Sequence, residues 1–308
     1  MKRLRSRTVL IPTILVMMLA VYPARSQQRG HYQPGVYGLD CCVENPAGYF
    51  LIYLPMFYST GSLKGANGQT ILTINGKANF KIHNFIFMVV PKKKLLGATY
   101  SASLDLPLVN AVIRPDRLSS SFSGHGLTDI YIEPLNLTWH KEKADIRAVY
   151  GFYPPTGKYD PNAVDNFGLG FWTHQFQLGT SAKLSSDETW NASVLGTFET
   201  HTTKKGSDIR PGNDLTIEYG FGKKVWDKRV NVGMAGYMLF QVSDTSGGPV
   251  ALRSVRGRTF ATGPEVYAEV TKLKIPVWVR YLPEYGVHAR TSGQMLVFGI
   301  AVGKVLKK

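Results

Sequence analysis

Hydrophobic and polar residues alternate along most of the chain, most clearly from Trp172 to Leu184. The even positions of this run are largely apolar and the odd positions mostly polar, which is the period of a β-strand. Both a half-buried strand of a soluble sheet and a strand of a membrane barrel have this pattern. The run is thirteen residues long, whereas soluble strands usually have about five or six residues and membrane-spanning strands need roughly 9–11. Its length favours a barrel strand.

Twelve runs with this character lie between Gly48 and Leu306. They occupy residues 48–59, 70–90, 95–107, 126–139, 144–153, 170–184, 190–201, 213–224, 230–243, 257–271, 275–286 and 294–306. Helical periodicity is nearly absent, and no linker rich in Pro, Gly or Ser divides the chain. We therefore predict a single all-β domain that covers most of the chain.

The connectors between these runs alternate between long and short. Long connectors occupy 60–69, 108–125, 154–169, 202–212 and 244–256, short ones 91–94, 140–143, 185–189, 225–229 and 272–274, and an intermediate one 287–293. Outer-membrane barrels have this layout because their periplasmic turns are short and their extracellular loops long, with an even number of strands. The sequence predicts a closed antiparallel transmembrane β-barrel of about 12 strands over residues 48–308, in the bacterial outer membrane.

The alternation also assigns residues to the two faces of the barrel wall. It turns Phe176 toward lipid and Gln177 toward the lumen. Four tryptophans fall at strand ends, where the aromatic girdles of membrane barrels lie: Trp139, Trp172, Trp190 and Trp226. Charged residues on the lumen side are expected to pair across the interior or to line a selective pore. These are Asp129, Glu133, Arg147, Glu199, Glu218, Glu265, Glu269, Arg280 and Glu284.

The first 26 residues have the features of a secretory signal peptide. A basic stretch precedes an apolar run at 9–21, and small residues follow it where a cleavage site requires them. The apolar run is shorter than the roughly 18–20 residues of a spanning helix, so we expect cleavage before Gln27 and export of the mature chain. Residues 27–47, which contain Pro34 and Pro46, are expected to form a periplasmic segment that enters the lumen as a plug.

Charge and cysteine content narrow the choice of partners. The mature chain holds 31 Lys and Arg against 21 Asp and Glu, a net charge of +10. An exported chain seldom meets nucleic acid, and no aromatic-basic recognition motif is present, so we expect no nucleic-acid partner and favour phosphorylated lipopolysaccharide. The two cysteines, Cys41 and Cys42, are neighbours and cannot form a disulfide framework. Two free thiols or an intermolecular bridge are expected.

Three long motifs carry a resemblance to a known family. They are GLTDIYIEPLNLTWH at 126–140, YGFYPPTGKYD at 150–160 and NFGLGFWTHQ at 166–175, with shorter matches at 31–35, 208–223 and 262–266. In these motifs the chain resembles the phenol meta-pathway (MetA-pathway) degradation family of bacterial outer-membrane proteins. The resemblance implies a transporter-like β-barrel, inserted by the barrel-assembly machinery and associated with uptake of hydrophobic or aromatic compounds. The adjacent cysteines and a C-terminus without an aromatic residue depart from this pattern.

The sequence contains no convincing catalytic or metal site. A nucleophile needs a base within reach and a group that orients the base, and Ser123 and His125 have no such third group nearby in sequence. His174 falls on the lipid side of its strand, where an interfacial role is the simpler interpretation. Neither HExxH nor a Cys/His cluster occurs, and 160–166 lacks the Gly and terminal Glu of a calcium loop. We expect no catalytic residue, cofactor or metal.

Two functions remain open. The first is passive transport of small hydrophobic or aromatic compounds, and the alternative is a non-conducting structural or interaction barrel that binds lipopolysaccharide or a partner. Aromatic residues on the lumen side favour transport: Tyr131, Tyr237, Tyr267 and Trp278. Tyr153, Tyr159 and Phe167 flank or lie in the long 154–169 connector, where they offer a surface for stacking of a flat solute or merely cap the barrel.

Overall fold

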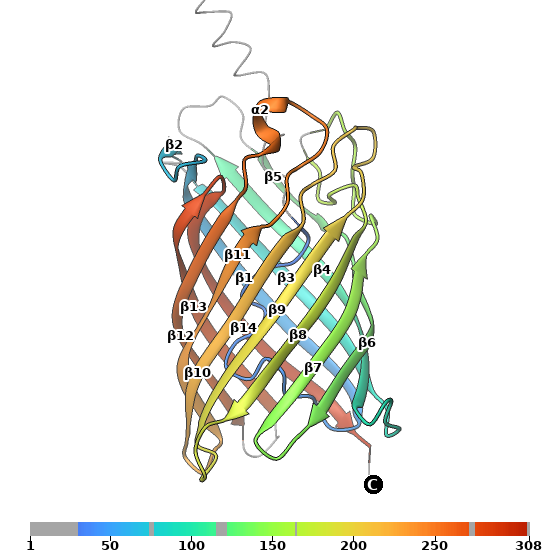
Figure 1. The fold of residues 1–308 in the computed structure, drawn as a ribbon, viewed down its shortest axis with the longest axis vertical. Helices are drawn as coiled ribbons and strands as arrows, with labels where there is room; N and C mark the ends of the chain where they lie inside the picture. The colour runs from blue at the N-terminus through green and yellow to red at the C-terminus, as the bar shows by residue number, and fades with distance from the viewer. Residues whose placement is uncertain (1–29, 74–76, 115–121, 164, 271–274, 307–308) are drawn as a thin grey trace, which may run out of the picture.

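The computed structural model describes residues 30–73, 77–114, 122–163, 165–270 and 275–306. Twelve antiparallel strands form a barrel in which sequence neighbours pair, and β14 pairs with β1 to close it (Figure 1). Their bounds are β1 Gly48–Lys64, β3 Lys77–Val90, β4 Thr99–Arg114, β6 Tyr131–His140, β7 Ala144–Tyr153, β8 Thr173–Lys183, β9 Trp190–His201, β10 Asp214–Val225, β11 Val230–Gln241, β12 Arg258–Val270, β13 Ile275–His288 and β14 Thr291–Val305. The predicted all-β barrel of 12 strands is confirmed.

Two of the predicted runs are divided in the structure. The run at 70–90 gives β2 Thr70–Thr73, which pairs with the end of β1, and then β3. The run at 126–139 is split between β5 Phe122–Leu127, which pairs with the upper part of β4, and β6. Both short strands extend hairpins above the barrel wall at its upper end in Figure 1, where the one-turn helix α2 Val250–Arg253 also lies. Among the described helices none is long and apolar enough to span a membrane.

The connectors retain the predicted alternation with one exception. The predicted connector 287–293 is reduced to a tight turn at Ala289 and Arg290. Polar residues at its two ends belong to the strands, since β13 continues to His288 and β14 begins at Thr291. All long loops lie at one end of the barrel, and the short turns and the start of β1 lie at the other (Figure 1). We call these the long-loop end and the short-turn end.

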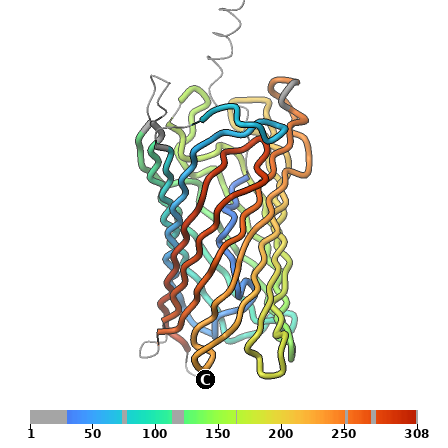
Figure 2. Tube along the Cα trace, turned by 90° about the vertical axis from the view of Figure 1, so that its left-hand side faces the viewer, coloured from blue at the N-terminus to red at the C-terminus, as the bar shows by residue number. Residues whose placement is uncertain are grey.

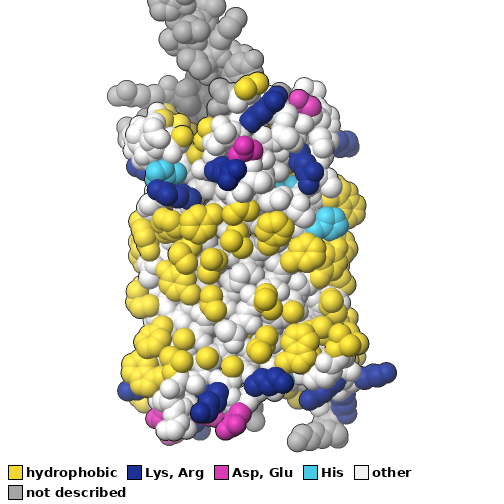
Figure 3. Space-filling model, in the orientation of Figure 1, with side chains coloured by type: hydrophobic (Ala, Val, Ile, Leu, Met, Phe, Trp, Pro, Cys, Tyr) yellow, Lys and Arg dark blue, Asp and Glu magenta, His cyan; other side chains and the backbone are white. Residues whose placement is uncertain are grey.

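The outer face of the wall is apolar and the inner face mostly polar. On β8 the side chains of Phe176 and Leu178 are 47% and 66% exposed, whereas Gln177 between them is 4% exposed. Hydrophobic side chains cover the middle of the barrel, and Lys and Arg gather at its two ends (Figure 3). This arrangement matches a lipid-facing band of a membrane barrel.

Residues 30–47 thread the lumen, and we call this segment the plug (Figure 2). Its side chains are packed against the inner wall: Leu39 is 1% and Cys42 0% exposed. Gly35 has a φ of 93°, a conformation that favours glycine. A Cβ at Gly35 would lie 2.7 Å from the Leu282 side chain, so no larger residue fits there without displacement.

Candidate functional site

Carboxylates on the inner wall accept hydrogen bonds from the backbone of the plug. Glu199 accepts from the amides of His31 and Tyr32, each at 2.9 Å. Glu218 accepts from the Gly35 amide at 2.7 Å and from the hydroxyl of Tyr32. Further contacts join Asp214 to the Gly30 amide at 2.9 Å and Glu265 to the Leu39 amide at 3.2 Å. The side chains of the wall thus supply acceptors for plug amides that lie outside any β-strand.

Two arginines bind carbonyl oxygens of the plug. Arg280 donates to the Gly35 carbonyl at 2.7 Å and to Glu265 at 3.0 Å. Arg147 donates to the Cys41 carbonyl at 3.0 Å, and its other terminal nitrogen lies 3.7 Å from a Glu133 oxygen. All four charged side chains are buried. Each of these ion pairs joins two neighbouring strands, β12 to β13 and β6 to β7, and the plug carbonyls complete the bonding of the arginines.

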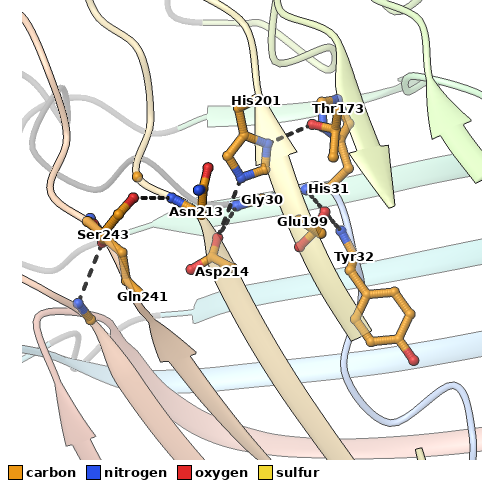
Figure 4. Close-up of polar contacts among 12 residues, drawn as sticks. Gly30, His31, Tyr32, Thr173, Glu199, His201, Asn213, Asp214, Gln241 and Ser243 are labelled. Carbon is orange, nitrogen blue, oxygen red and sulfur yellow. Dashed lines mark hydrogen bonds and ion pairs between the residues drawn. The ribbon is translucent and has the colours of Figure 1, made fainter. Parts of the chain in front are cut away.

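A chain of polar side chains holds the first described residues of the plug (Figure 4). The Thr173 hydroxyl lies 2.6 Å from Nδ1 of His31 and 2.8 Å from Nδ1 of His201. Nε2 of His201 is 3.8 Å from Asp214. Thr173 is 0% exposed, so its hydroxyl is shielded from solvent.

Asp129 connects the plug to the long segment between β7 and β8, which we call loop 154–172. One carboxylate oxygen lies 2.9 Å from Nε2 of His31 and accepts from the Leu169 amide at 2.7 Å. The other accepts from the Gly157 amide at 2.8 Å. Burial would raise the pKa of Asp129, but these hydrogen bonds from His31, Leu169 and Gly157 outweigh it and hold the pKa below its usual value. The carboxylate thus stays ionised and fixes this loop over the lumen.

One cavity of about 470 Å³ runs beside the plug, and we call it the lumen cavity. Near the long-loop end it is bordered by Thr128 and Asp129, and at the short-turn end by Lys228 and Arg229 in the turn after β10. Between them its wall carries apolar side chains on neighbouring strands: Ile52 and Leu54 on β1, and Ile86 and Met88 on β3. The plug, with residues such as Cys41, forms part of the facing side.

The predicted aromatic residues divide into three groups. Tyr131, Tyr153, Tyr267 and Trp278 border the lumen cavity. Tyr237 is instead buried in an apolar cluster with Leu54, Met56, Leu239 and Leu282, and its hydroxyl donates to Glu284 at 2.8 Å. Tyr159 and Phe167 lie in loop 154–172, where Lys204 sits over the Tyr159 ring at 5.1 Å. The structure therefore brings together four of the seven at the cavity.

The predicted lumen charges also differ in position. Glu133, Arg147, Glu199, Glu218, Glu265 and Arg280 are buried on the inner wall, and Glu284 accepts from the hydroxyls of Tyr58 and Tyr237. Asp129 precedes β6 in a connector, and Glu269 is exposed where the cavity meets the short-turn end. Sequence reasoning missed His31, Glu44 and Asp105 at the cavity, although Asp105 lies inside the predicted 95–107 strand.

The adjacent cysteines are buried free thiols in the plug. Their sulfurs lie 2.8 Å apart, and Cys41 Sγ is 4.0 Å from the Ser181 hydroxyl on β8. Both thiols are buried in the lumen, so neither is exposed for the intermolecular bridge that the sequence left open. Among the residues that the structure describes, no three His, Cys, Asp or Glu side chains are grouped so as to hold a metal ion.

Residues 60–298 match the family described as "Putative MetA-pathway of phenol degradation". The chain belongs to this family. The resemblance in the sequence motifs is thereby confirmed. No curated protein matches the sequence.

Three solved structures align with most of this chain. The COG4313 outer membrane channel from Pseudomonas putida F1 aligns with a TM-score of 0.69 and 13% identity, over 89% of this chain and 100% of that one. The β domain of the Bordetella autotransporter BrkA aligns at 0.46 and 9% identity, over 83% and 98%. A mutant of TodX, a monoaromatic hydrocarbon channel, aligns at 0.42 and 11% identity, over 85% and 91%. The first alignment shows that this family member has the fold of an outer-membrane channel.

Proposed function

We propose that this outer-membrane barrel is a passive channel for small hydrophobic or aromatic compounds, which move through the lumen cavity beside the plug. The observation that carries this proposal is the continuity of that cavity from Thr128 and Asp129 to Lys228 and Arg229. A barrel with only a structural role needs no such path. The family description, which refers to phenol degradation, supports an aromatic solute.

The cavity wall has the composition expected for such solutes. Ligand sites are typically about 300–1,000 Å³ and mostly apolar, with a few polar groups that fix orientation. The lumen cavity falls in this range at about 470 Å³. Besides the apolar strip on β1 and β3, the cavity borders aromatic rings that include Tyr153 and Trp278. A sugar would lose many hydrogen bonds to water there, whereas a small aromatic ring would lose few.

Uptake by intact cells that lack other channels for aromatic compounds tests the proposal. Expression of the protein should raise the initial uptake of radiolabelled toluene but not that of arabinose. Ile86→Trp should abolish the gain, because the indole fills the cavity, whereas Leu178→Trp on the lipid face should preserve it. Equal toluene uptake with and without the protein, at normal outer-membrane levels, would favour the non-conducting alternative.

We further propose two partners and no catalytic role. Exposed basic residues at the long-loop end offer phosphate contacts to lipopolysaccharide: Lys158, Lys205, Arg210, Arg256 and Arg258. Insertion by the barrel-assembly machinery is expected for any barrel of this fold. The Thr173 hydroxyl stands between two imidazoles as a nucleophile would, but it is wholly buried and does not border the lumen cavity. No solute in the cavity reaches it, which argues against an enzyme.

A further inference from the structure

Asp105 on β4 differs from the other carboxylates of the lumen. Glu133 accepts from the Asn136 amide at 2.9 Å, and Glu199, Glu218 and Glu265 are bonded to the plug. Oδ1 of Asp105, in contrast, is buried with no hydrogen-bond partner among the described residues. No ion pair involves Asp105 within the described part of the chain. Backbone hydrogen bonds from Phe85 and Leu106 reach the carboxylate, but Oδ1 keeps an open acceptor position, and the side chain borders the lumen cavity.

The surroundings of Asp105 are apolar and aromatic. Across the sheet, Asp105 pairs with Ile86 of β3 on one side and with Tyr131 of β6 on the other, and Ile86 pairs with Ile52 of β1. All four residues border the lumen cavity, so they form one row along the inner wall. A carboxylate in such a row is costly unless a donor reaches it.

We propose that Asp105 is a specificity-determining residue of the channel, whose carboxylate accepts a hydrogen bond from the hydroxyl or amine group of a small aromatic solute. The ring of that solute lies against Ile52, Ile86 and Tyr131. This inference rests on the proposed channel function. A hydroxyl-bearing aromatic compound loses water when it enters the cavity, and Asp105 replaces that water with a hydrogen bond. A hydrocarbon of the same size gains nothing from Asp105.

Phenol and toluene make the sharpest test because they differ only by a hydroxyl in place of a methyl group. Initial uptake of each is measured below saturation in cells with equal amounts of the barrel in the outer membrane. Asp105→Leu should lower phenol uptake by up to about tenfold, the effect expected for one lost hydrogen bond, and leave toluene uptake unchanged. Phenol uptake in Asp105→Asn should lie between the values for the wild type and Asp105→Leu, since the amide oxygen of Asn still accepts a hydrogen bond. Asp187→Asn, which changes a carboxylate in a short turn, is the control and should take up phenol and toluene at the wild-type rates.

The outcomes separate this inference from the channel proposal. If the wild type accelerates uptake of neither compound, the channel proposal fails. If toluene passes but Asp105→Leu leaves the ratio of phenol to toluene uptake unchanged, the assignment of Asp105 is wrong while the channel stands. Should Asp105→Leu fail to assemble, the same ratio in Asp105→Asn decides, and a ratio equal to that of the wild type overturns the assignment.

Discussion

Nε2 of His31 lies 2.9 Å from Oδ2 of Asp129, and this contact joins the plug to the connector before β6. The same carboxylate accepts the amides of Leu169 and Gly157 from loop 154–172. Three parts of the chain that are distant in sequence therefore meet at one side chain beside the end of the lumen cavity. This junction ties the plug and loop 154–172 together at the long-loop end.

Asp129→Ala should loosen this junction. The two loop amides lose their acceptor, at a cost of about 1–3 kcal/mol for each group left buried without a partner. We expect higher conductance in planar bilayers and faster protease cleavage within loop 154–172. Asp244→Ala, which removes a surface ion pair with Arg256 in another long loop, serves as the control. Conductance equal to that of the wild type would show that the junction does not restrict passage.

The junction should also respond to acid in a defined direction. The pKa of Asp129 is lowered in the folded protein. The contacts of its carboxylate therefore stabilise the fold at any pH above the ordinary aspartate pKa, and this stabilisation is lost as the pH falls through the lowered pKa of the folded protein. The wild type should therefore show a rise in conductance in acid, below the ordinary aspartate pKa, and Asp129→Ala should lack this rise. A rise in the variant at the same pH would assign the transition to another group.

Aromatic residues near the long-loop end should affect entry. Replacement of Tyr153, Tyr159 and Phe167 together by Ala should slow uptake of an aromatic compound and leave outer-membrane yield unchanged. Tyr153→Ala alone should reproduce most of this effect, because Tyr153 borders the lumen cavity and stacks on His31 with ring centroids 4.8 Å apart. Unchanged uptake in a correctly assembled triple variant would leave these residues a capping role.

The two faces of β8 should differ in their tolerance of charge. A charge on the lipid face near mid-membrane costs roughly 2–4 kcal/mol, and Phe176 is 47% exposed on that face. Phe176→Arg should therefore lower the amount of heat-modifiable barrel far more than Gln177→Arg, whose site faces the lumen. Equal yields of the two variants would be inconsistent with the assigned faces.

The positions of the loops predict where protease can cut in whole cells. Lys92, Lys93 and Lys94 and the pair Lys141 and Lys143 are exposed in short turns, which bacterial barrels place in the periplasm. Trypsin added to intact cells should spare these sites and cut at the long-loop end, for example at Lys205. Once the outer membrane is permeabilised, the short turns should become cleavable. Cleavage at Lys92–Lys94 in intact cells would mean the opposite orientation.

The barrel could be predicted from the sequence because alternation is local. Phe176 and Gln177 differ in exposure as their positions in the strand require, and the same holds from Trp190 to His201. The plug lacks this alternation of polar and apolar residues, because its backbone is bonded to side chains of the wall and not to a neighbouring strand. Its path through the lumen could therefore not be predicted. Glycines on the inner face were an unused signal: a Cβ at Gly220 would lie 2.7 Å from Leu39 Cα, and glycine within a strand often marks close backbone approach.

The candidate site was predictable only in part. The alternation of positions along each strand places Tyr131 and Trp278 on the lumen side, but it does not show which lumen residues the plug leaves uncovered. Tyr237 also points to the lumen side of its strand, and yet it is buried in an apolar cluster. Asp105 carries no sequence feature that separates it from Glu199, because the difference between them is whether a plug amide lies opposite.

The central claim is that solutes pass beside a plug that stays in place, and a covalent lock tests it most directly. Cys41 Sγ lies 4.0 Å from the Ser181 hydroxyl, so Ser181→Cys combined with Cys42→Ser should allow an oxidant such as diamide to cross-link the plug to β8. The lock joins the plug to β8, whereas the strip of Ile52 and Ile86 lies on β1 and β3. Cells carrying the oxidised double variant should take up toluene at the wild-type rate. Uptake that stops on oxidation and returns on reduction would contradict the account, because passage would then require the plug to move.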